Sequence, residues 1–435
     1  MRWWIYNGLF ALGFVAMMPY YLARMWRRGG YREHFLQRLG VYDEATRTAL
    51  REPRLWVHAV SVGEMLVALK FIEGFRAVRP DARFLVSVNT STGHALARRR
   101  LAAADCLIYV PADFPWVIRR VLARIRPRGL VLTEGEFWPN LLRALQARGI
   151  PTVLINGRVS DRSFRGYRRL RAFFRPVLAG LDPACVQTET DAARLRELGT
   201  PAEAIRVLGN AKYDVPSMRP DDAATARSIF AAAGIPPEAL ILLGGSTWPG
   251  EEKILAGLYL ALRREEPRLR LVLAPRHAER RRAVIEEVTA AGLRPVLRTR
   301  CRAGEAVASP GPDSVLILDT TGELQSLYSG ADLIFVGKSL TETGGQNIIE
   351  PAQYAKPILV GPHMENFRAV TEDFLRAGAL IQVADAAGLE AELARLLKEP
   401  ARAAALGRAA GQWVESSRGV LRQTVAEVLR RISAE

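Results

Sequence analysis

The stretch LWVHAVSVGEMLVALKFIEGFRAVRPDARFLVSVN, residues 55–89, carries the pattern that decides the fold. Two short apolar runs rich in valine and leucine, residues 55–60 and 84–89, flank a stretch whose apolar residues recur with helical spacing. A strand, a helix and a second strand in this order are typical of parallel α/β sheets. The stretch therefore predicts a β–α–β unit, with a tight turn at residues 61–63 between the first strand and the helix.

The same alternation continues along the chain in two blocks. Further strands are predicted at residues 106–111, 129–134, 151–157 and 184–189, and after a linker at 209–220 they recur at 240–245, 269–275, 315–320, 332–337, 357–361 and 381–383. We expect two doubly wound Rossmann-like domains facing each other across a cleft, with ligands bound at the carboxyl ends of the strands. The expected divisions are 1–30 (hydrophobic anchor and basic juxtamembrane segment), 31–212 (first domain), 213–405 (second domain) and 406–435 (a C-terminal helix crossing back to the first domain).

Length and composition exclude several classes of protein. The chain has 435 residues, of which 49% are hydrophobic and 24% charged, so it is neither a disordered chain nor a multi-span membrane protein. Its net charge of +16 is concentrated in one half, because residues 1–210 hold 33 bases and 17 acids and the remainder holds 28 of each. This asymmetry predicts an anionic partner for the first half.

Neither the cysteines nor the histidines indicate a metal site. Cys106, Cys185 and Cys301 are odd in number and far apart, and the five histidines include no closely spaced pair. We therefore expect a reducing compartment, no disulfide framework and no structural metal. The sequence also lacks G-x-G-x-x-G and G-x-x-x-x-G-K-[ST], which argues against dinucleotide oxidoreductases and P-loop phosphotransfer.

Residues 3–22 carry no formal charge over a length sufficient to cross a bilayer. Aromatic residues lie near both ends of this segment, and four arginines follow it: Arg24, Arg27, Arg28 and Arg32. The arrangement predicts a membrane anchor with the rest of the chain in the cytoplasm, at the inner face of the membrane. A helix lying in the interface plane, favoured by Asn7, Gly8, Gly13 and Pro19, and a packed core helix remain open.

Acidic residues follow two strands of the first half. Glu64 opens a helix after the first strand, and Glu134 and Glu136 lie in a strand-to-helix turn after the fourth. Helix capping would account for Glu64 and Glu136. A carboxylate presented into the cleft could instead act as a general base, and Glu134 has no simple capping explanation.

The second half has short polar motifs after its strands. Gly344, Gly345, Gln346 and Asn347 precede a helix, and their amides form a predicted phosphate site, with Glu350 one turn further on for a ribose diol. Arg276 and Lys338 could neutralise a phosphate without a divalent cation. His277 is either part of this site or a satisfied core side chain.

Six motifs together resemble the 3-deoxy-D-manno-octulosonic acid (Kdo) transferases, the lipopolysaccharide biosynthesis enzymes of Gram-negative bacteria. They are S-V-G-E (61–64), T-E-G-E-F-W-P-N (133–140), I-N-G-R-V-S (155–160), L-G-N-A-K-Y-D (208–214), A-P-R-H (274–277) and G-G-Q-N-I-I-E-P (344–351). The resemblance implies a GT-B glycosyltransferase that is inverting and needs no metal or other cofactor. Its partners would be CMP-Kdo as donor, a lipid A precursor (lipid IVA) as acceptor and an anionic membrane surface, but no nucleic acid.

The resemblance also assigns residues. It makes Glu64 the catalytic base and Glu134 its support. The expected donor-binding residues are Ser246, Thr247, Arg276, His277, Thr321, Gly322, Glu323, Lys338, Gly344, Gly345, Gln346, Asn347 and Glu350. The expected acceptor-binding residues are Ser61, Gly63, Arg158, Arg162 and Arg165. The chain departs from the family at Trp248 and Gln346, where histidine is frequent, and at Gly135, where threonine is frequent.

Two other functions are weighed against this one. Another membrane-associated GT-B enzyme that uses a UDP-sugar would share the fold, the cleft and the basic face. A nucleic-acid-binding protein is suggested by the arginine and aromatic residues of 162–175, but no RNA-binding motif is present. As a helix, that stretch places Phe164, Tyr167, Leu170 and Phe174 on one side, which fits either a membrane interface or a core helix with a solvated basic face.

Overall fold

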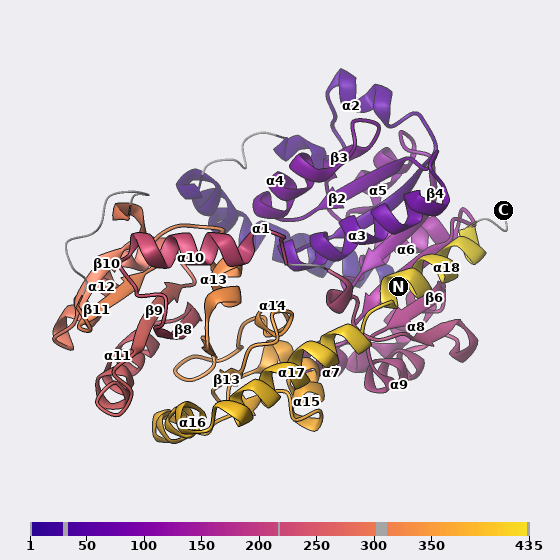
Figure 1. Cartoon of the computed structure of the whole chain (residues 1–435). Coiled ribbons are helices and arrows are strands. Elements are labelled where there is room, and N and C mark those ends of the chain that lie inside the picture. The colour runs from indigo at the N-terminus through magenta and orange to yellow at the C-terminus, as the bar shows by residue number, and fades with distance from the viewer. Residues whose placement is uncertain (1, 29–33, 216–217, 302–310, 433–435) are drawn as a thin grey trace. The chain divides into compact units, whose positions relative to one another are not determined.

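The computed structural model describes residues 2–28, 34–215, 218–301 and 311–432. It divides into two compact units, Met1–Val215 together with Ser417–Glu435, and Pro216–Ser416 (Figure 1). Each unit is built on one seven-stranded sheet whose paired strands are all parallel. The two predicted Rossmann-like domains are therefore present.

The sheet of the first unit has the order β3-β2-β1-β4-β5-β6-β7. Its strands are β1 (Arg54–Ala59), β2 (Phe84–Val88), β3 (Cys106–Tyr109), β4 (Pro127–Thr133), β5 (Thr152–Gly157), β6 (Leu181–Val186) and β7 (Ile205–Val207). All six residues of β1 are buried, as expected for a central parallel strand covered on both faces.

Helices cover both faces of this sheet. One core contains residues of α3 (Val62–Val78), α4 (Ser91–Arg100) and α18 (Val420–Ile432). The other contains residues of α5 (Pro115–Leu122), α6 (Pro139–Gln146), α8 (Arg171–Leu178) and α9 (Glu189–Leu198). The helices α1 (Arg2–Arg28), α2 (Glu44–Ala49) and α7 (Asp161–Arg169) complete the unit.

The sheet of the second unit has the order β10-β11-β9-β8-β12-β13-β14. Its strands are β8 (Leu240–Thr247), β9 (Leu269–Pro275), β10 (Arg294–Leu297), β11 (Ser314–Ile317), β12 (Leu333–Val336), β13 (Ile358–Val360) and β14 (Ile381–Gln382). Its helices are α10 (Asp222–Ala232), α11 (Glu251–Leu262), α12 (Arg281–Ala290), α13 (Leu324–Gly330), α14 (Ile349–Ala352), α15 (Arg368–Arg376), α16 (Ala386–Lys398) and α17 (Pro400–Ser416).

The C-terminal segment forms two helices rather than one. The chain turns at Gly419, which has a φ of 97°, a conformation that glycine adopts without strain. Asp214 holds the start of α18, because its carboxylate accepts hydrogen bonds from the backbone N–H groups of Gly419 and Leu421, both at 2.5 Å. The helix α17 belongs to the second unit and α18 to the first.

The N-terminal helix α1 is part of the first unit, and the structure does not support the predicted membrane-crossing segment. The Tyr6 hydroxyl donates a hydrogen bond to Asp113 (2.9 Å), and the Asn140 side chain donates one to Asn7 (2.8 Å). Within the described residues, no helix combines the length and the apolar character needed to cross a membrane. Polar side chains paired with the globular unit explain the difference, because hydrocarbon offers them no partners.

The helix α1 has two unlike sides. On one side Trp3 contacts Phe173, with ring centroids 4.7 Å apart, and Phe10 contacts Phe114 at 5.0 Å. The exposed apolar side chains of the same helix are Trp4, Ile5, Leu9, Leu12, Val15 and Met17. The side chains of Arg24, Arg27, Arg28 and Arg32 lie outside the described residues.

The arginine-rich stretch 162–175 forms α7 and α8 and packs against the core. Phe174 is buried, and Phe164 and Tyr167 contact the same core, whereas Leu170 is exposed. The arginines of α7 are exposed: Arg162, Arg165, Arg168 and Arg169. The apolar side of this stretch therefore faces the protein interior, with a basic face toward solvent.

Candidate active site

In each sheet the strand order reverses once, and ligands of doubly wound folds bind at such switch points. In the first unit the reversal lies between β1 and β4, and in the second between β8 and β12. The predicted acidic residues follow β1 and β4, and Lys338 follows β12. The candidate site residues are thus grouped at the switch point of each unit.

Glu64 closes a capping box at the start of α3. Its carboxylate accepts hydrogen bonds from the backbone N–H groups of Val60 (3.0 Å) and Ser61 (3.3 Å), and the Ser61 hydroxyl accepts one from the Glu64 N–H (3.2 Å). The predicted capping role is therefore real. Burial and then the negative charge of Glu134 raise the pKa of Glu64, while the hydrogen bonds from Val60 and Ser61 lower it. The balance favours proton uptake relative to an ordinary glutamate.

Glu134 is paired with a lysine that the sequence did not single out. The Lys212 ammonium lies 2.6 Å from the Glu134 carboxylate, and the Asn156 side chain donates to the same oxygen at 3.4 Å. Glu134 has a φ of 65°, which is uncommon for a residue with a side chain. Lys212 could have been noticed as one of six lysines in a chain with 61 basic residues.

Glu136 adds a third acid to this group. Its Oε2 atom is buried without a hydrogen-bond partner among the described residues. Burial, and to a smaller extent the charge of Glu64, raises the pKa of Glu136 to about 7. The negative charges of Glu134 and Glu64 thus interact with each other, and that of Glu64 interacts with Glu136.

The neighbouring turns are closely fitted. A Cβ atom at Gly135 would lie 2.5 Å from the carbonyl oxygen of Arg158, so any residue with a side chain at this position would require the turn to move. The Arg158 N–H donates to the Glu134 carbonyl (3.4 Å). Ser61, Gly63 and Arg158 thus lie at the acidic site, whereas Arg162 and Arg165 project from the exposed face of α7.

A buried histidine supports the same region. His58 lies on β1, and its Nδ1 is 2.9 Å from the Ser87 hydroxyl. The Trp138 indole N–H donates to the other ring nitrogen of His58 (3.4 Å). Burial lowers the pKa of His58 to about 4, so the ring is neutral at physiological pH. Its hydrogen bonds fix Trp138, which follows the Glu134–Glu136 turn.

In the second unit, Glu251 joins the two loops at the switch point. It is fully buried, and its carboxylate accepts hydrogen bonds from four backbone N–H groups at 2.8–3.0 Å: Trp248, Lys338, Ser339 and Leu340. Burial raises the pKa of Glu251, and these four bonds lower it. The sequence gives no sign of this role for Glu251.

Trp248 lies between two predicted donor-binding residues. The Lys338 ammonium is 4.4 Å from the centroid of the Trp248 ring, and the His277 ring makes an edge contact with centroids 5.8 Å apart. The neighbouring Thr247 is fully buried and donates its hydroxyl to Glu252 (2.9 Å). Lys338 and His277 therefore both contact Trp248, and the buried Thr247 stabilises the same loop through Glu252.

Glu350 is held in a fixed orientation near a cation. The Asn347 side chain donates to its carboxylate (3.0 Å). Burial raises the pKa of Glu350, whereas the hydrogen bond from Asn347 and the charge of Arg276 lower it. Burial and then the charge of Glu350 raise the pKa of Tyr328, whereas the charge of Arg276 and a hydrogen bond with Ser246 lower it. Ser246, Arg276, Asn347 and Glu350 are thus brought together.

The predicted phosphate site on the glycine loop is not formed by the two glycine amides. The N–H of Gly344 donates to the Glu365 carboxylate (2.6 Å), and that of Gly345 donates to the Lys338 carbonyl (2.8 Å). The helix that follows, α14, has four residues, too short for a substantial dipole. Both amides are already satisfied, so an incoming phosphate would meet a carboxylate at Gly344. Gln346 lies half-buried between this loop and Asn347.

The turn after β11 is ordered by an ion pair. Glu323 accepts hydrogen bonds from the Thr320 hydroxyl and from Arg298, the latter at 2.8 Å. Thr321 and Gly322 are exposed at the tip of the turn. Glu323 therefore serves the turn itself, and Thr321 and Gly322 are its accessible residues. Across the described part of the chain, no group of three or more His, Cys, Asp and Glu side chains is placed to hold a metal ion.

Comparison with known proteins identifies the family. A sequence model described as 3-deoxy-D-manno-octulosonic-acid transferase (kdotransferase) matches residues 33–215. The 3-deoxy-D-manno-octulosonic acid transferase of Bordetella pertussis is 36% identical over 433 residues, 96% of this chain and 98% of that protein. The enzyme of the same name from Haemophilus influenzae is 28% identical, over 90% of each chain.

A solved structure supports the fold. The UDP-GlcNAc 2-epimerase from Neisseria meningitidis bound to UDP-GlcNAc has a TM-score of 0.60 at 15% identity, covering 87% of this chain and all of that one. This likeness concerns the two-domain GT-B architecture alone. The similarity to the Bordetella pertussis enzyme extends over nearly the whole of both proteins, and the chain therefore belongs to the 3-deoxy-D-manno-octulosonic acid transferase family and is a glycosyltransferase that transfers Kdo.

Proposed function

We propose that the chain transfers Kdo from CMP-Kdo to the lipid A precursor lipid IVA, with inversion at the anomeric carbon and without a divalent metal. The observation that carries this proposal is the acidic site at the end of β1. Glu64 keeps part of its hydrogen-bonding capacity unused, and its pKa is raised by burial and by Glu134. Such a carboxylate is suited to accept a proton from a sugar hydroxyl.

The reaction follows from this placement. Glu64 takes the proton as the acceptor hydroxyl oxygen forms a bond to the anomeric carbon of Kdo, on the face opposite CMP. The bond from that carbon to the CMP phosphate oxygen breaks, and its electron pair leaves with CMP. Lys212 and Asn156 hold Glu134 beside the base, so that a like charge keeps Glu64 ready to take up a proton.

On the donor side, we propose that side chains rather than loop amides neutralise the phosphate. Arg276 and Lys338 supply positive charge, and two fixed cations can replace a metal in stabilising a leaving phosphate. Glu350, oriented by Asn347, is placed to accept hydrogen bonds from ribose hydroxyls. His277 and Lys338, on either side of Trp248, would contact the sugar or its carboxylate.

We further propose that the protein binds the cytoplasmic face of the inner membrane without crossing it. The exposed apolar side chains of α1 and the exposed arginines of α7 support this attachment. Apolar residues beside basic ones are typical of helices that lie in the interface of anionic membranes.

Incubation of the purified protein with CMP-Kdo and lipid IVA, followed by mass spectrometry of the lipid, tests the proposal. We expect the lipid to gain the mass of one or more Kdo residues, in the presence of a chelator as well as without it. Analysis of the new linkage by NMR should show inversion. Transfer from UDP-sugars but not from CMP-Kdo would instead support the rival donor, and loss of transfer with the chelator would refute metal independence.

A further inference from the structure

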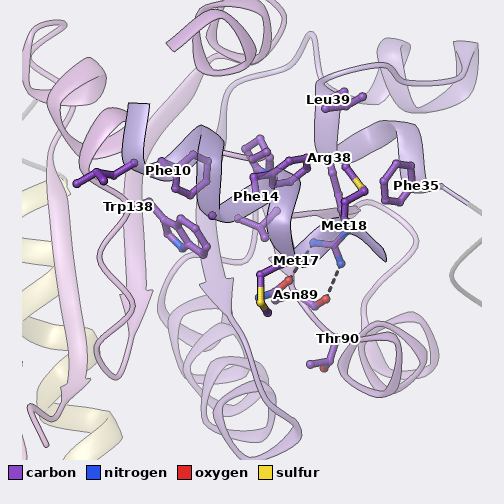
Figure 2. Close-up of a pocket in the computed structure, with 15 residues that line it drawn as sticks. Phe10, Phe14, Met17, Met18, Phe35, Arg38, Leu39, Asn89, Thr90 and Trp138 are labelled. Atoms are coloured by element: carbon purple, nitrogen blue, oxygen red, sulfur yellow. Dashed lines mark hydrogen bonds between the residues drawn. The ribbon is translucent and has the colours of Figure 1, made fainter. Parts of the chain in front are cut away.

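The helix α1 and the rest of the first unit line a cavity of about 560 Å³, here called the α1 cavity. Figure 2 shows Phe10, Phe14 and Met17 of α1 on one side of it, with Trp138, Arg38 and Asn89 nearby. Most of its lining is apolar, and Arg38 is the one cationic residue among the described residues that line it. A cavity of this composition is suited to a hydrocarbon chain attached to an anionic group.

The α1 cavity is connected to the acidic site by hydrogen bonds. Thr90 lines the cavity, and its hydroxyl donates to the carbonyl of Val60 (3.0 Å), whose own N–H donates to Glu64 (3.0 Å). Trp138 also lines the cavity and bonds to His58 on β1. A molecule in the cavity therefore lies next to the turn that presents Glu64.

The cavity is also continuous with the exposed apolar side of α1. Leu9 and Met17 line it and are at the same time 64% and 47% exposed. The helix itself is held in place by Tyr6 and Asn7, which bond to the globular unit. A hydrocarbon chain could therefore enter the cavity from the side of α1 that carries the exposed leucines and valine, and the helix would not have to move.

We propose that the α1 cavity takes one acyl chain of the acceptor lipid and so places the acceptor sugar at Glu64. This inference rests on the proposed lipid acceptor. The positive charge of Arg38 complements the phosphate of such a lipid. One acyl chain of the lipid would leave the bilayer and lie in the cavity. Each methylene group that the cavity buries contributes to binding. Shortening the acyl chain by two carbons that would lie inside the cavity should therefore weaken acceptor binding roughly tenfold.

Two glycines of α1 provide a matched test. Gly13 lines the cavity and Gly8 does not, and a Cβ atom at either position would meet nothing within 4 Å. A leucine at either position therefore starts from an unobstructed Cβ atom, and the effect on helix propensity is the same. We expect Gly13→Leu to raise the acceptor KM at least tenfold, leaving the CMP-Kdo KM and the rate with a short-chain acceptor analogue unchanged. Gly8→Leu should change none of these.

Equal effects of the two substitutions, or an unchanged KM for the acylated acceptor in Gly13→Leu, would overturn the proposal.

A second measurement uses an acceptor analogue with a diazirine at the end of one acyl chain, irradiated with the full-length protein in liposomes. We expect labelling of Met17, Phe35 or their neighbours, reduced by unlabelled acceptor and not by phosphatidylglycerol. Labelling that phosphatidylglycerol reduces equally would mean that a bilayer lipid fills the cavity.

The photolabel also separates this inference from the proposed function. Labelling of the cavity without any transfer from CMP-Kdo would refute the proposed reaction and leave the cavity assignment in place. Transfer from CMP-Kdo with the label found elsewhere would refute the acyl-chain site alone.

Discussion

Glu64 in the first unit and Glu251 in the second occupy equivalent places but have different surroundings. Each follows a glycine at the start of a helix, in the sequences VGE (62–64) and PGE (249–251), and each lies beside the switch point of its sheet. Glu251 is fully buried and accepts four backbone hydrogen bonds. Glu64 is 9% exposed and accepts two.

The number of accepted hydrogen bonds distinguishes a carboxylate with a structural role, Glu251, from one that is available for chemistry, Glu64. A carboxylate has about four positions at which it can accept hydrogen bonds. Glu251 uses all of them to join two loops, and nothing is left for a substrate. Glu64 uses half, and burial together with the negative charge of Glu134 raises its pKa. Similar turns can thus carry opposite roles, and the number of satisfied lone pairs distinguishes them.

The largest expected effect is that of Glu64→Gln. Glutamine serves in a capping box as well as glutamate does, so capping alone predicts a normal enzyme. As the base, Glu64 cannot be replaced, and we expect kcat to fall by roughly a factor of 1,000 with little change in Tm or in CMP-Kdo binding. The conservative Glu73→Gln on the exposed side of α3 is the control. Turnover within tenfold of the wild type would remove Glu64 from the base role.

Glu251→Gln should act on stability instead. The amide offers one acceptor oxygen, and its NH₂ group would face N–H donors, so several buried backbone groups lose their partner. We expect the free energy of unfolding of the second unit to fall by about 3 kcal/mol, measured by denaturant titration. Glu286→Gln, at an exposed position on α12, should have no effect. An unchanged free energy of unfolding would contradict the role of Glu251 in joining the two loops.

Most strands could be predicted, because buried parallel strands form continuous apolar runs such as β1. The missed strands are β7 and β10, at sheet edges. β7 has three residues, and β10 has four and contains Pro295, which is tolerated at an edge but weakens the sequence pattern. The length of the uncharged N-terminal segment predicted a membrane span, but length alone could not show that Tyr6 and Asn7 have partners on the folded unit.

The sequence could indicate those candidate site residues that directly follow strands. Glu64 and Glu134 follow neighbouring strands, and the structure brings their charges close enough to interact. Lys212 was missed because it lies in a short turn after β7, and no local pattern connects it to Glu134. The amides of Gly344 and Gly345 were misjudged because the partner of the first, Glu365, lies 21 residues away.

Lys212→Met tests whether the charge of Glu134 affects the pKa of Glu64. Without the ammonium, the charge of Glu134 is no longer compensated, so the pKa of Glu64 should rise further. Since the base must be deprotonated, the acidic limb of the kcat/KM profile should move to higher pH, and activity on that limb should fall roughly tenfold. Lys70→Met, at a lysine on α3 paired with Glu73, is the control. A profile that does not move would show that Glu134 does not influence the base.

The smallest effect concerns the surfaces of the two units. Positive charge is concentrated in residues 1–210, and Arg165 lies on the exposed face of α7, whereas Arg282 is an exposed arginine of the second unit. An arginine near an anionic bilayer contributes about 1 kcal/mol, so Arg165→Gln should weaken binding to anionic liposomes roughly fivefold. Arg282→Gln should leave it unchanged, and both variants should bind neutral liposomes like the wild type. Equal losses from the two substitutions would mean that the charge asymmetry reflects overall basicity, and α7 would then have no special place at the membrane.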